Sequence, residues 1–465
     1  MEKVQFRNND KLQRIELPMT TISDNSFEKC SKLKEVTFLP TVKNIGNSAF
    51  SNCKSLTKVV LPPTIESIGE GVFCNCTSLC CIEIQSSITK ISSNMFNGCR
   101  SLKEVIIPPS VTSFESSAFS GCNQLRNISL ISKKITTSAN SNEKNDSLNC
   151  KSLIKIVLPS TIESIGEGVF CNCTSFGVVE LPSSITKISK DLFNGCTSLK
   201  EVIVPPSITS IESGAFSGCS ILESISIQND DCSSSPQITI PQTVTSIGSN
   251  AFNGCKLIKS LVFPPSVTSF GDGVCSRCLA LEEITLPPQI TVIGSYTFYY
   301  CKLLKEIEIP STVVEIKLNA FSDCKLLKKI SIPSSVTSIG DFCFQNCVNL
   351  CEISDLSSLK SLGNSAFLNC RLLKQVTIPS SIDTIGVNTF RLCESLESFT
   401  VPPSVTKICE NAFYDCFNLK EVIIPPSVTS IGKNAFCGCS SLVEVSIPPV
   451  TSIEIGTFKK CSSLV

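Results

Sequence analysis

The side chains that could carry chemistry in this sequence are cysteines and carboxylates. The chain has 29 cysteines, 40 Asp plus Glu residues balanced by 40 Lys plus Arg, and no histidine. Thiolates act as nucleophiles and zinc ligands, and paired carboxylates can act as general acid and base, as in glycoside hydrolysis. The absence of histidine excludes Ser-His-Asp and Cys-His arrangements and removes the commonest metal ligand.

Cys275 and Cys278 form a C-x-x-C motif, which can indicate redox or zinc chemistry. A zinc site needs a second such pair and a redox site needs a thioredoxin-like unit, and neither is found. The acidic residues recur at regular intervals along the chain, which is typical of a solvated face. The sequence also contains no phosphate-binding loop, dinucleotide fingerprint or zinc-protease motif. We therefore expect that this protein is not an enzyme and that it binds no cofactor and no metal.

The charge balance and the apolar pattern limit the partners. Equal numbers of basic and acidic residues give no electrostatic reason to expect nucleic acid. No apolar run reaches the length of a membrane helix, so membrane insertion is not expected. The N-terminal MEKVQFRNNDKLQRIELP lacks the apolar segment of a secretory signal. These features favour the cytoplasm.

Most cysteines belong to one long repeat. Nineteen of them form a series from Cys30 to Cys461 in which nearly every step is 23 residues. Phe stands three residues before 17 of these 19 cysteines, and Leu stands three residues after all but two. The consensus is L-x-x-[IV]-x-[IVL]-P-x-S-[VI]-T-x-I-G-x-x-A-F-x-x-C-x-x. An array of such units determines where all the remaining side chains of the molecule lie.

Each repeat predicts a small set of elements. L-x-x-I-x-I alternates like a short strand, and Pro ends it because Pro cannot donate to a sheet ladder. Ser-Val-Thr-x-Ile-Gly predicts a second extended piece, and Ala-Phe-x-x-Cys a tight or 3₁₀-like turn. One repeat cannot bury its own apolar face, so stacked repeats must share a core. We therefore predict a curved, β-rich solenoid of about 19–20 coils of 23 residues, with short parallel strands.

The phrase IPPSVTSIGKNAFCGCSSLVEVSIP, near the C-terminus, resembles the BspA-like leucine-rich repeats of bacterial surface antigens and protist parasites. The resemblance covers residues from about Phe6 to Val465. It implies a leucine-rich-repeat solenoid, a cell-surface location and a role in adhesion or partner binding. It brings no catalytic residues.

The repeat predicts one solenoid over residues 1–465, without a second domain. Residues 1–16 form a degenerate first coil, in which Phe6 and Asn9 occupy the Phe and Cys positions. Residues 462–465 begin a truncated last coil. Either its uncovered edge is tolerated, or it pairs with another molecule, which would give end-to-end self-association.

Two polar insertions, residues 132–149 and 228–237, break the register. They are either tolerated surface loops or specialised binding loops. Asp355 stands in an otherwise apolar strand position, where a buried carboxylate would be costly, so we expect a local bulge.

The cysteine series is expected to form a column of buried free thiols. Neighbouring coils would place these cysteines about 4.8 Å apart with parallel Cβ directions, whereas disulfides need closer Cβ atoms and a set dihedral. Buried thiols act as small apolar residues with weak hydrogen-bonding capacity, and they favour a reducing compartment. Cys275 and Cys278 fit the same interpretation, because Cys278 belongs to the series and Cys275 replaces the Phe before it.

The third and fifth positions of L-x-x-I-x-I should point outward on the concave side, where they form what we call the outer strip. Its members are Glu35, Val60, Glu83, Glu104, Ile106, Glu180, Glu201, Ile203, Glu283, Glu306, Glu308, Glu352, Glu421, Ile423 and Glu444. Either this mildly acidic strip with apolar spots binds an extended protein or glycoprotein ligand, or it is a solvated face without a ligand. It lacks the aromatic anchors that usually carry affinity, so single contacts would be weak.

Tyr299, Tyr300 and Tyr414 are the aromatic residues that could gather on the outside of the turn. They either form an outward cluster or pack on neighbouring coils.

Two functions follow from the whole sequence. One is a surface adhesion or host-interaction protein, and the other is an intracellular protein–protein interaction scaffold.

Overall fold

The computed structural model describes residues 5–131, 155–228, 238–354, 356–449 and 451–465. The chain divides into two compact units, residues 1–209 with 214–236 (unit 1) and residues 210–213 with 237–465 (unit 2). Most of the two insertions, and Asp355 with its expected bulge, lie outside the described residues. Each unit is a stack of coils of about 23 residues, and the described residues contain strands and turns but no helix.

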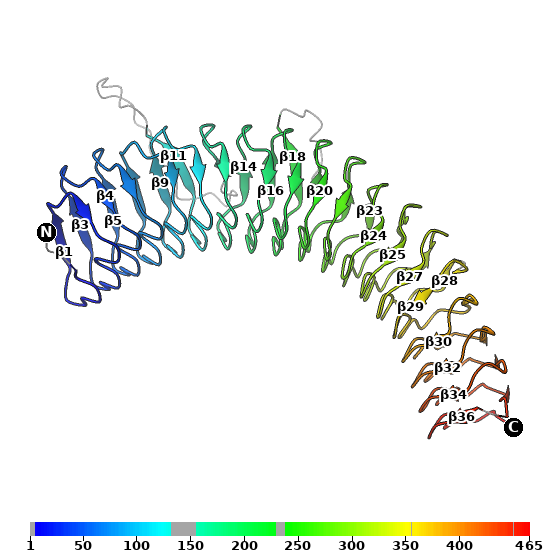
Figure 1. Cartoon of the computed structure of the whole chain (residues 1–465). Helices are drawn as coiled ribbons and strands as arrows, with labels where there is room; N and C mark the ends of the chain where they lie inside the picture. The colour runs from blue at the N-terminus through cyan, green and yellow to red at the C-terminus, as the bar shows by residue number, and fades with distance from the viewer. Residues whose placement is uncertain (1–4, 132–154, 229–237, 355, 450) are drawn as a thin grey trace, which may run out of the picture. The chain divides into compact units, whose positions relative to one another are not determined.

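Most coils contribute one strand to each of two rows, and the strands of successive coils lie side by side (Figure 1). In unit 1 the first row is β1 (Arg14–Leu17), β3 (Glu35–Phe38), β5 (Lys58–Leu61), β7 (Cys81–Ile84), β9 (Glu104–Ile107), β11 (Asn127–Leu130), β12 (Lys155–Val157), β14 (Val178–Glu180), β16 (Glu201–Val204) and β18 (Ser224–Ile227). The second row of unit 1 is β2 (Thr21–Ile22), β4 (Asn44–Ile45), β6 (Ser67–Ile68), β8 (Lys90–Ile91), β10 (Ser113–Phe114), β13 (Ser164–Ile165) and β15 (Lys187–Ile188).

Unit 2 repeats this arrangement. Its first row is β19 (Ile238–Thr239), β21 (Ser260–Val262), β23 (Glu283–Thr285), β26 (Lys329–Ile330), β28 (Glu352–Ile353), β31 (Ser398–Thr400), β33 (Glu421–Ile423) and β35 (Glu444–Ser446). Its second row is β17 (Ser210–Ile211), β20 (Ser246–Ile247), β22 (Ser269–Phe270), β24 (Val292–Ile293), β25 (Glu315–Ile316), β27 (Ser338–Ile339), β29 (Ser361–Leu362), β30 (Thr384–Ile385), β32 (Lys407–Ile408), β34 (Ser430–Ile431) and β36 (Ser452–Ile453).

The strands pair in parallel and in register with the repeat. Val59 of β5 pairs with Ile82 of β7, and Val422 of β33 pairs with Val445 of β35, so each residue lies beside its equivalent in the next coil. The predicted class, a parallel β-solenoid of 23-residue coils, is confirmed.

The third side of each coil is a turn that contains two residues in the left-handed region. They lie five and one residues before the column cysteine, as for Ser48 (φ 53°) and Asn52 (φ 60°) before Cys53. These conformations interrupt helical winding, so of the two expected forms, a tight turn or a 3₁₀-like turn, the described coils adopt single hydrogen-bonded turns. The turns also join neighbouring coils, since Phe50 N donates to Val72 O at 3.0 Å.

Phenylalanine rings stack through the core of each unit. In unit 1 the rings of Phe27 and Phe50 are 5.1 Å apart and nearly parallel, and in unit 2 those of Phe321 and Phe344 are 5.5 Å apart. Between Phe27 and Leu442 the described column residues are fully buried, together with the leucines that follow the cysteines, such as Leu56. This shared core is what one repeat alone could not form.

Among the described residues, the column thiols are free and act as hydrogen-bond donors. Cys53 Sγ donates to the carbonyl oxygen of Phe27 in the preceding coil at 3.1 Å, and Cys347 Sγ donates to Phe321 O at 3.2 Å. Burial raises the pKa of the Cys76 and Cys99 thiols well above the ordinary value. These thiols therefore remain protonated at neutral pH and are not activated nucleophiles.

The C-x-x-C motif belongs to the same core. Cys278 Sγ donates to Phe252 O at 3.2 Å, as the other column thiols do, and Cys275 is fully buried in the position of the column phenylalanine. Burial raises the pKa of Cys275 well above its ordinary value. The motif is therefore part of the packing.

Candidate functional site

The first strand row alternates between buried and exposed side chains, which gives the outer strip its position. In β3 the side chains of Val36 and Phe38 are buried, whereas Glu35 and Thr37 are exposed. Among the predicted strip residues, the exposed ones are Glu35, Val60, Glu283, Glu306, Glu308, Glu352, Glu421, Ile423 and Glu444. The partly exposed ones are Glu83, Glu104, Ile106, Glu180, Glu201 and Ile203. Parallel register arranges these side chains in rows along each unit.

Apolar side chains in the fifth position interrupt the polar surface of the strip. Val60 keeps 40% of its surface exposed and Ile423 keeps 54%. Val157 and Val262 are exposed to a similar degree at equivalent positions. Val262 was not among the predicted residues, although its position in the repeat is enough to find it.

Basic residues share the third position with the carboxylates, so the strip carries both charges. Arg14 pairs in register with Glu35, and their side chains form an ion pair at 3.2 Å. The ion pair of Lys329 with Glu352 joins neighbouring coils in the same way, and Lys155 binds Glu180 at 2.9 Å. The prediction of a mildly acidic strip overlooked these cations, which the consensus position would have revealed.

One part of the strip in unit 2 keeps like charges together. Glu421 and Glu444 are direct neighbours in the register of β33 and β35, and both are exposed. Neither residue forms an ion pair within the described part of the chain. Glu283, Glu306 and Glu308, in earlier coils of unit 2, also have no ion pair among the described residues. Like charges side by side on a sheet are unfavourable by themselves. The Glu421–Glu444 pair can therefore attract a basic surface of a partner.

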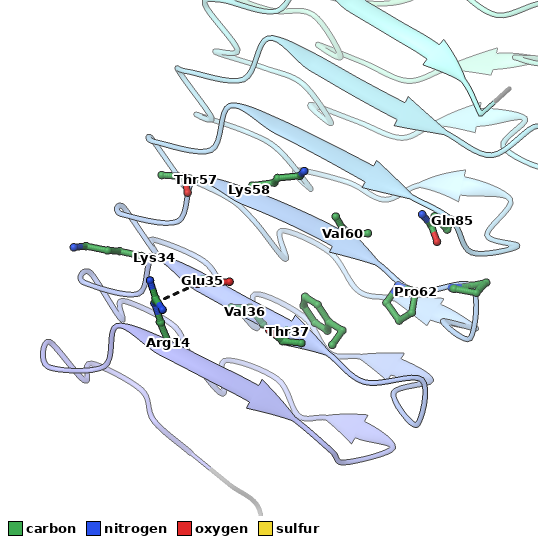
Figure 2. A pocket seen from close by; sticks show the side chains of 12 residues that line it. Arg14, Lys34, Glu35, Val36, Thr37, Thr57, Lys58, Val60, Pro62 and Gln85 are labelled. Carbon is green, nitrogen blue, oxygen red and sulfur yellow. Dashed lines mark ion pairs between the residues drawn. The ribbon is translucent and has the colours of Figure 1, made fainter. Parts of the chain in front are cut away.

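A shallow hollow lies on the outer strip near the start of unit 1 (Figure 2). Its volume is about 600 Å³, and residues of β1, β3 and β5 contribute to its lining. Figure 2 shows the Arg14–Glu35 ion pair at one side, with Val60 and Pro62 across the hollow. Arg14, Lys34 and Lys58 provide three cations, and Glu35 is the one carboxylate that lines the hollow. This part of the strip therefore differs in charge from the Glu421–Glu444 pair of unit 2.

Two cysteines outside the column, Cys80 and Cys81, lie next to each other, and Cys81 is on the outer strip. Cys81 occupies a third position between Lys58 and Glu104, and its Sγ is 3.7 Å from Cys80 Sγ. Burial, and then the neighbouring Cys80, raise the pKa of the Cys81 thiol. Cys81 therefore remains a thiol at neutral pH.

The tyrosines expected on the turn lie there, and they differ in their contacts. The rings of Tyr299 and Tyr300 contact each other, with centroids 4.8 Å apart. Tyr414 instead packs under Arg391 of the preceding coil, at 4.9 Å from its ring centroid. Tyr296 joins the first pair and was not predicted.

The described residues contain no group of three or more potential metal ligands. Over the same parts of the chain, no helix has the length and apolar character needed to cross a membrane.

The repeat and its structure agree with a known family. A family model described as a BspA-type leucine-rich repeat region, with six copies, matches residues 1–126, 143–234, 230–351 and 337–465. The chain belongs to this family. BspA-type and other leucine-rich-repeat proteins generally mediate protein–protein interaction or adhesion, and they are typically non-catalytic.

Solved leucine-rich-repeat structures resemble this BspA-type chain. One from Bacteroides ovatus is 25% identical and has a TM-score of 0.52, with 89% of this chain and 87% of that chain covered. One from Eubacterium ventriosum is 21% identical, with 87% and 88% covered and a TM-score of 0.40. A leucine-rich cell surface protein from Faecalibacterium prausnitzii is 22% identical, with 95% and 87% covered and a TM-score of 0.35. A comparison with curated proteins finds no match.

Proposed function

We propose that this protein is a non-catalytic adhesion module that binds a protein or glycoprotein through the outer strip. The observation that carries the proposal is the combination of exposed apolar side chains, such as Ile423, with neighbouring carboxylates that have no ion pair among the described residues, such as Glu421 and Glu444. Apolar contact would supply affinity, and the carboxylates would orient a basic segment of the partner. Repetition along the strip lets weak contacts add up.

A substitution on the strip tests this function. The full chain is immobilised and incubated separately with extracellular matrix proteins and with cell extract, and bound proteins are quantified by mass spectrometry. We expect a partner that the wild type retains and the double variant Glu421→Lys, Ile423→Lys loses. Lys407→Glu in β32 is the matched control, because Lys407 is exposed on the second strand row. Equal retention by all three proteins would contradict binding through the strip.

The alternative function is an intracellular protein–protein interaction scaffold. The thiol column favours it, because an S–H group that donates to a carbonyl must remain reduced, and the cytosol keeps thiols reduced. Labelling of intact cells with a membrane-impermeant biotin reagent, with a cytosolic protein as lysis control, separates the two functions. Labelling of this protein alone supports adhesion, and labelling only after lysis supports the scaffold. End-to-end self-association stays a prediction, which sedimentation of the purified chain would test.

A further inference from the structure

Three of the four tyrosines of the chain gather in one coil of unit 2. The rings of Tyr296 and Tyr299 meet edge to face with centroids 5.6 Å apart, and Tyr299 contacts Tyr300 at 4.8 Å. Lys302 Nζ lies 5.1 Å from the ring centroid of Tyr300, whereas Tyr296 keeps 41% of its surface exposed. We call Tyr296, Tyr299 and Tyr300 the tyrosine cluster. It lies on the turn side of the coil, away from the outer strip.

The backbone under the cluster is strained. Tyr296 and Tyr300 occupy the two left-handed positions of the turn, with φ of 59° and 62°. Glycine and asparagine fit this conformation best, and most described coils use Gly, Asn, Asp or Ser there. No other described coil gives both positions to large side chains. A strained position filled by an exposed ring indicates a use beyond folding.

Two members of the cluster, Tyr296 and Tyr299, form one wall of a hollow of about 490 Å³. Tyr296 and Tyr299 face the polar side chains of the two preceding coils across it, among them Asn250, Asp272 and Arg277. Pockets of about 300–1,000 Å³ are typical of small ligands, and the volume of this hollow lies within that range. The size of the hollow therefore favours a compact ligand or the end of a chain.

Three polar side chains in the hollow are held in place before any ligand binds. Asn253 Nδ2 donates to Asn250 Oδ1 at 3.1 Å, and Asp272 Oδ1 accepts from Ser295 N at 2.8 Å. The backbone N of Arg277 also donates to Tyr299 O at 2.6 Å, which holds the main chain of Arg277 next to the cluster. Fixed polar groups lower the entropic cost of binding.

We propose that the hollow binds a neutral oligosaccharide. A sugar ring presents a C–H face that can stack on Tyr296, and its hydroxyl groups both donate and accept hydrogen bonds, as the amides, the carboxylate and the guanidinium require. One carboxylate and one guanidinium balance each other, so an anion would meet Asp272 and a cation would meet Arg277. The site would act independently of the outer strip.

Tyrosine fluorescence gives a direct readout, because the chain has no tryptophan and only four tyrosines. In the variant Tyr414→Phe all emission comes from the tyrosine cluster. This variant is titrated with maltohexaose, cellohexaose, chitohexaose and mannohexaose, and binding is measured in parallel by calorimetry. We expect saturable binding of at least one of them with a change in emission.

A second substitution locates the site. Tyr296→Asn removes the exposed ring and inserts the residue that Asn250 and Asn319 place at the equivalent position, so the fold is retained. It should weaken binding about tenfold through the lost stacking. Phe342→Asn makes the same change at the equivalent position two coils further along, outside the hollow, and should leave binding unchanged.

Three results would overturn the proposal. The first is that none of the four sugars binds at millimolar concentration. The second is that binding is insensitive to Tyr296→Asn. The third is that the hollow prefers another class of ligand, which is tested with sulfated heparin fragments and a proline-rich peptide under the same conditions.

Discussion

The carbonyl oxygen of a column phenylalanine accepts two hydrogen bonds at once. Phe50 O accepts from Cys53 N within its own turn and from Cys76 Sγ of the next coil, both at 3.2 Å. Cysteine suits this position because it is small, apolar and able to donate one weak hydrogen bond. The series of cysteines could be predicted from the sequence. The carbonyl oxygen that accepts each thiol hydrogen bond could not, because it depends on how far successive coils are offset.

Protonation of the column thiols makes stability depend on alkaline pH. Burial raises the folded-state pKa of thiols such as Cys122 and Cys324 above the ordinary value of 9.0, so the unfolded chain loses these protons first. The stabilisation is complete below the unfolded pKa and falls as pH rises above it, by about 1.4 kcal/mol per pH unit for each thiol. We expect the urea midpoint under reducing conditions to fall steeply above about pH 9.

The range from pH 6 to pH 8 is the internal control for this prediction. The chain has no histidine, so the urea midpoint should hardly change there. A midpoint that stays constant up to pH 10 would show that the column thiols do not remain protonated in the folded state.

At the scale of the element, the turn is where the sequence was least informative. The strand rows follow from the alternating apolar pattern and from the Pro that ends each first strand, and both were predicted. The two left-handed positions were missed, although Asn52, Asn75 and Gly98 share one of them. Their backbone angle is set by the contact with the next coil, and residues as different as Gly and Tyr occupy the same conformation.

The left-handed conformation makes the turn sensitive to a single methyl group. Gly121 has φ of 71°, and an added Cβ would lie 3.5 Å from the Cα of Gly98, an ordinary contact. Gly121→Ala therefore isolates the backbone strain and should lower the free energy of unfolding by about 1 kcal/mol. Ser116→Ala, at an exposed position of the same turn, should have little effect in the same urea titration. Equal effects of the two substitutions would argue against strain.

At the scale of the whole molecule, the sequence predicted the features that recur in every repeat. It did not predict the contacts between unlike residues of neighbouring coils. The Phe, Cys and Leu columns and the outward direction of the strip residues all follow from one 23-residue period. The tyrosine cluster and the mixed charge of the strip arise from unlike residues in neighbouring coils, such as Arg277 beside Tyr299 or Arg14 beside Glu35. A consensus hides such differences because it averages over coils. The single solenoid over residues 1–465 stays a prediction.

Stability in such a stack should spread only to neighbours. Phe321 packs between Phe298 at 5.3 Å and Phe344 at 5.5 Å, all within unit 2. Phe321→Ala should cost about 4 kcal/mol through the cavity it leaves. Hydrogen exchange should then show lost protection in the flanking coils, with unit 1 unaffected. Uniform loss of protection along the chain would contradict nearest-neighbour coupling.

The parallel register also determines how each unit would respond to mechanical force. Bonds such as Phe50 N to Val72 O join one coil only to the next, so a pull along the stack loads the coils in series. Each coil that detaches would release 23 residues, or about 80 Å of extended chain, before the next is loaded. A stack of this kind would yield in repeated steps and absorb work.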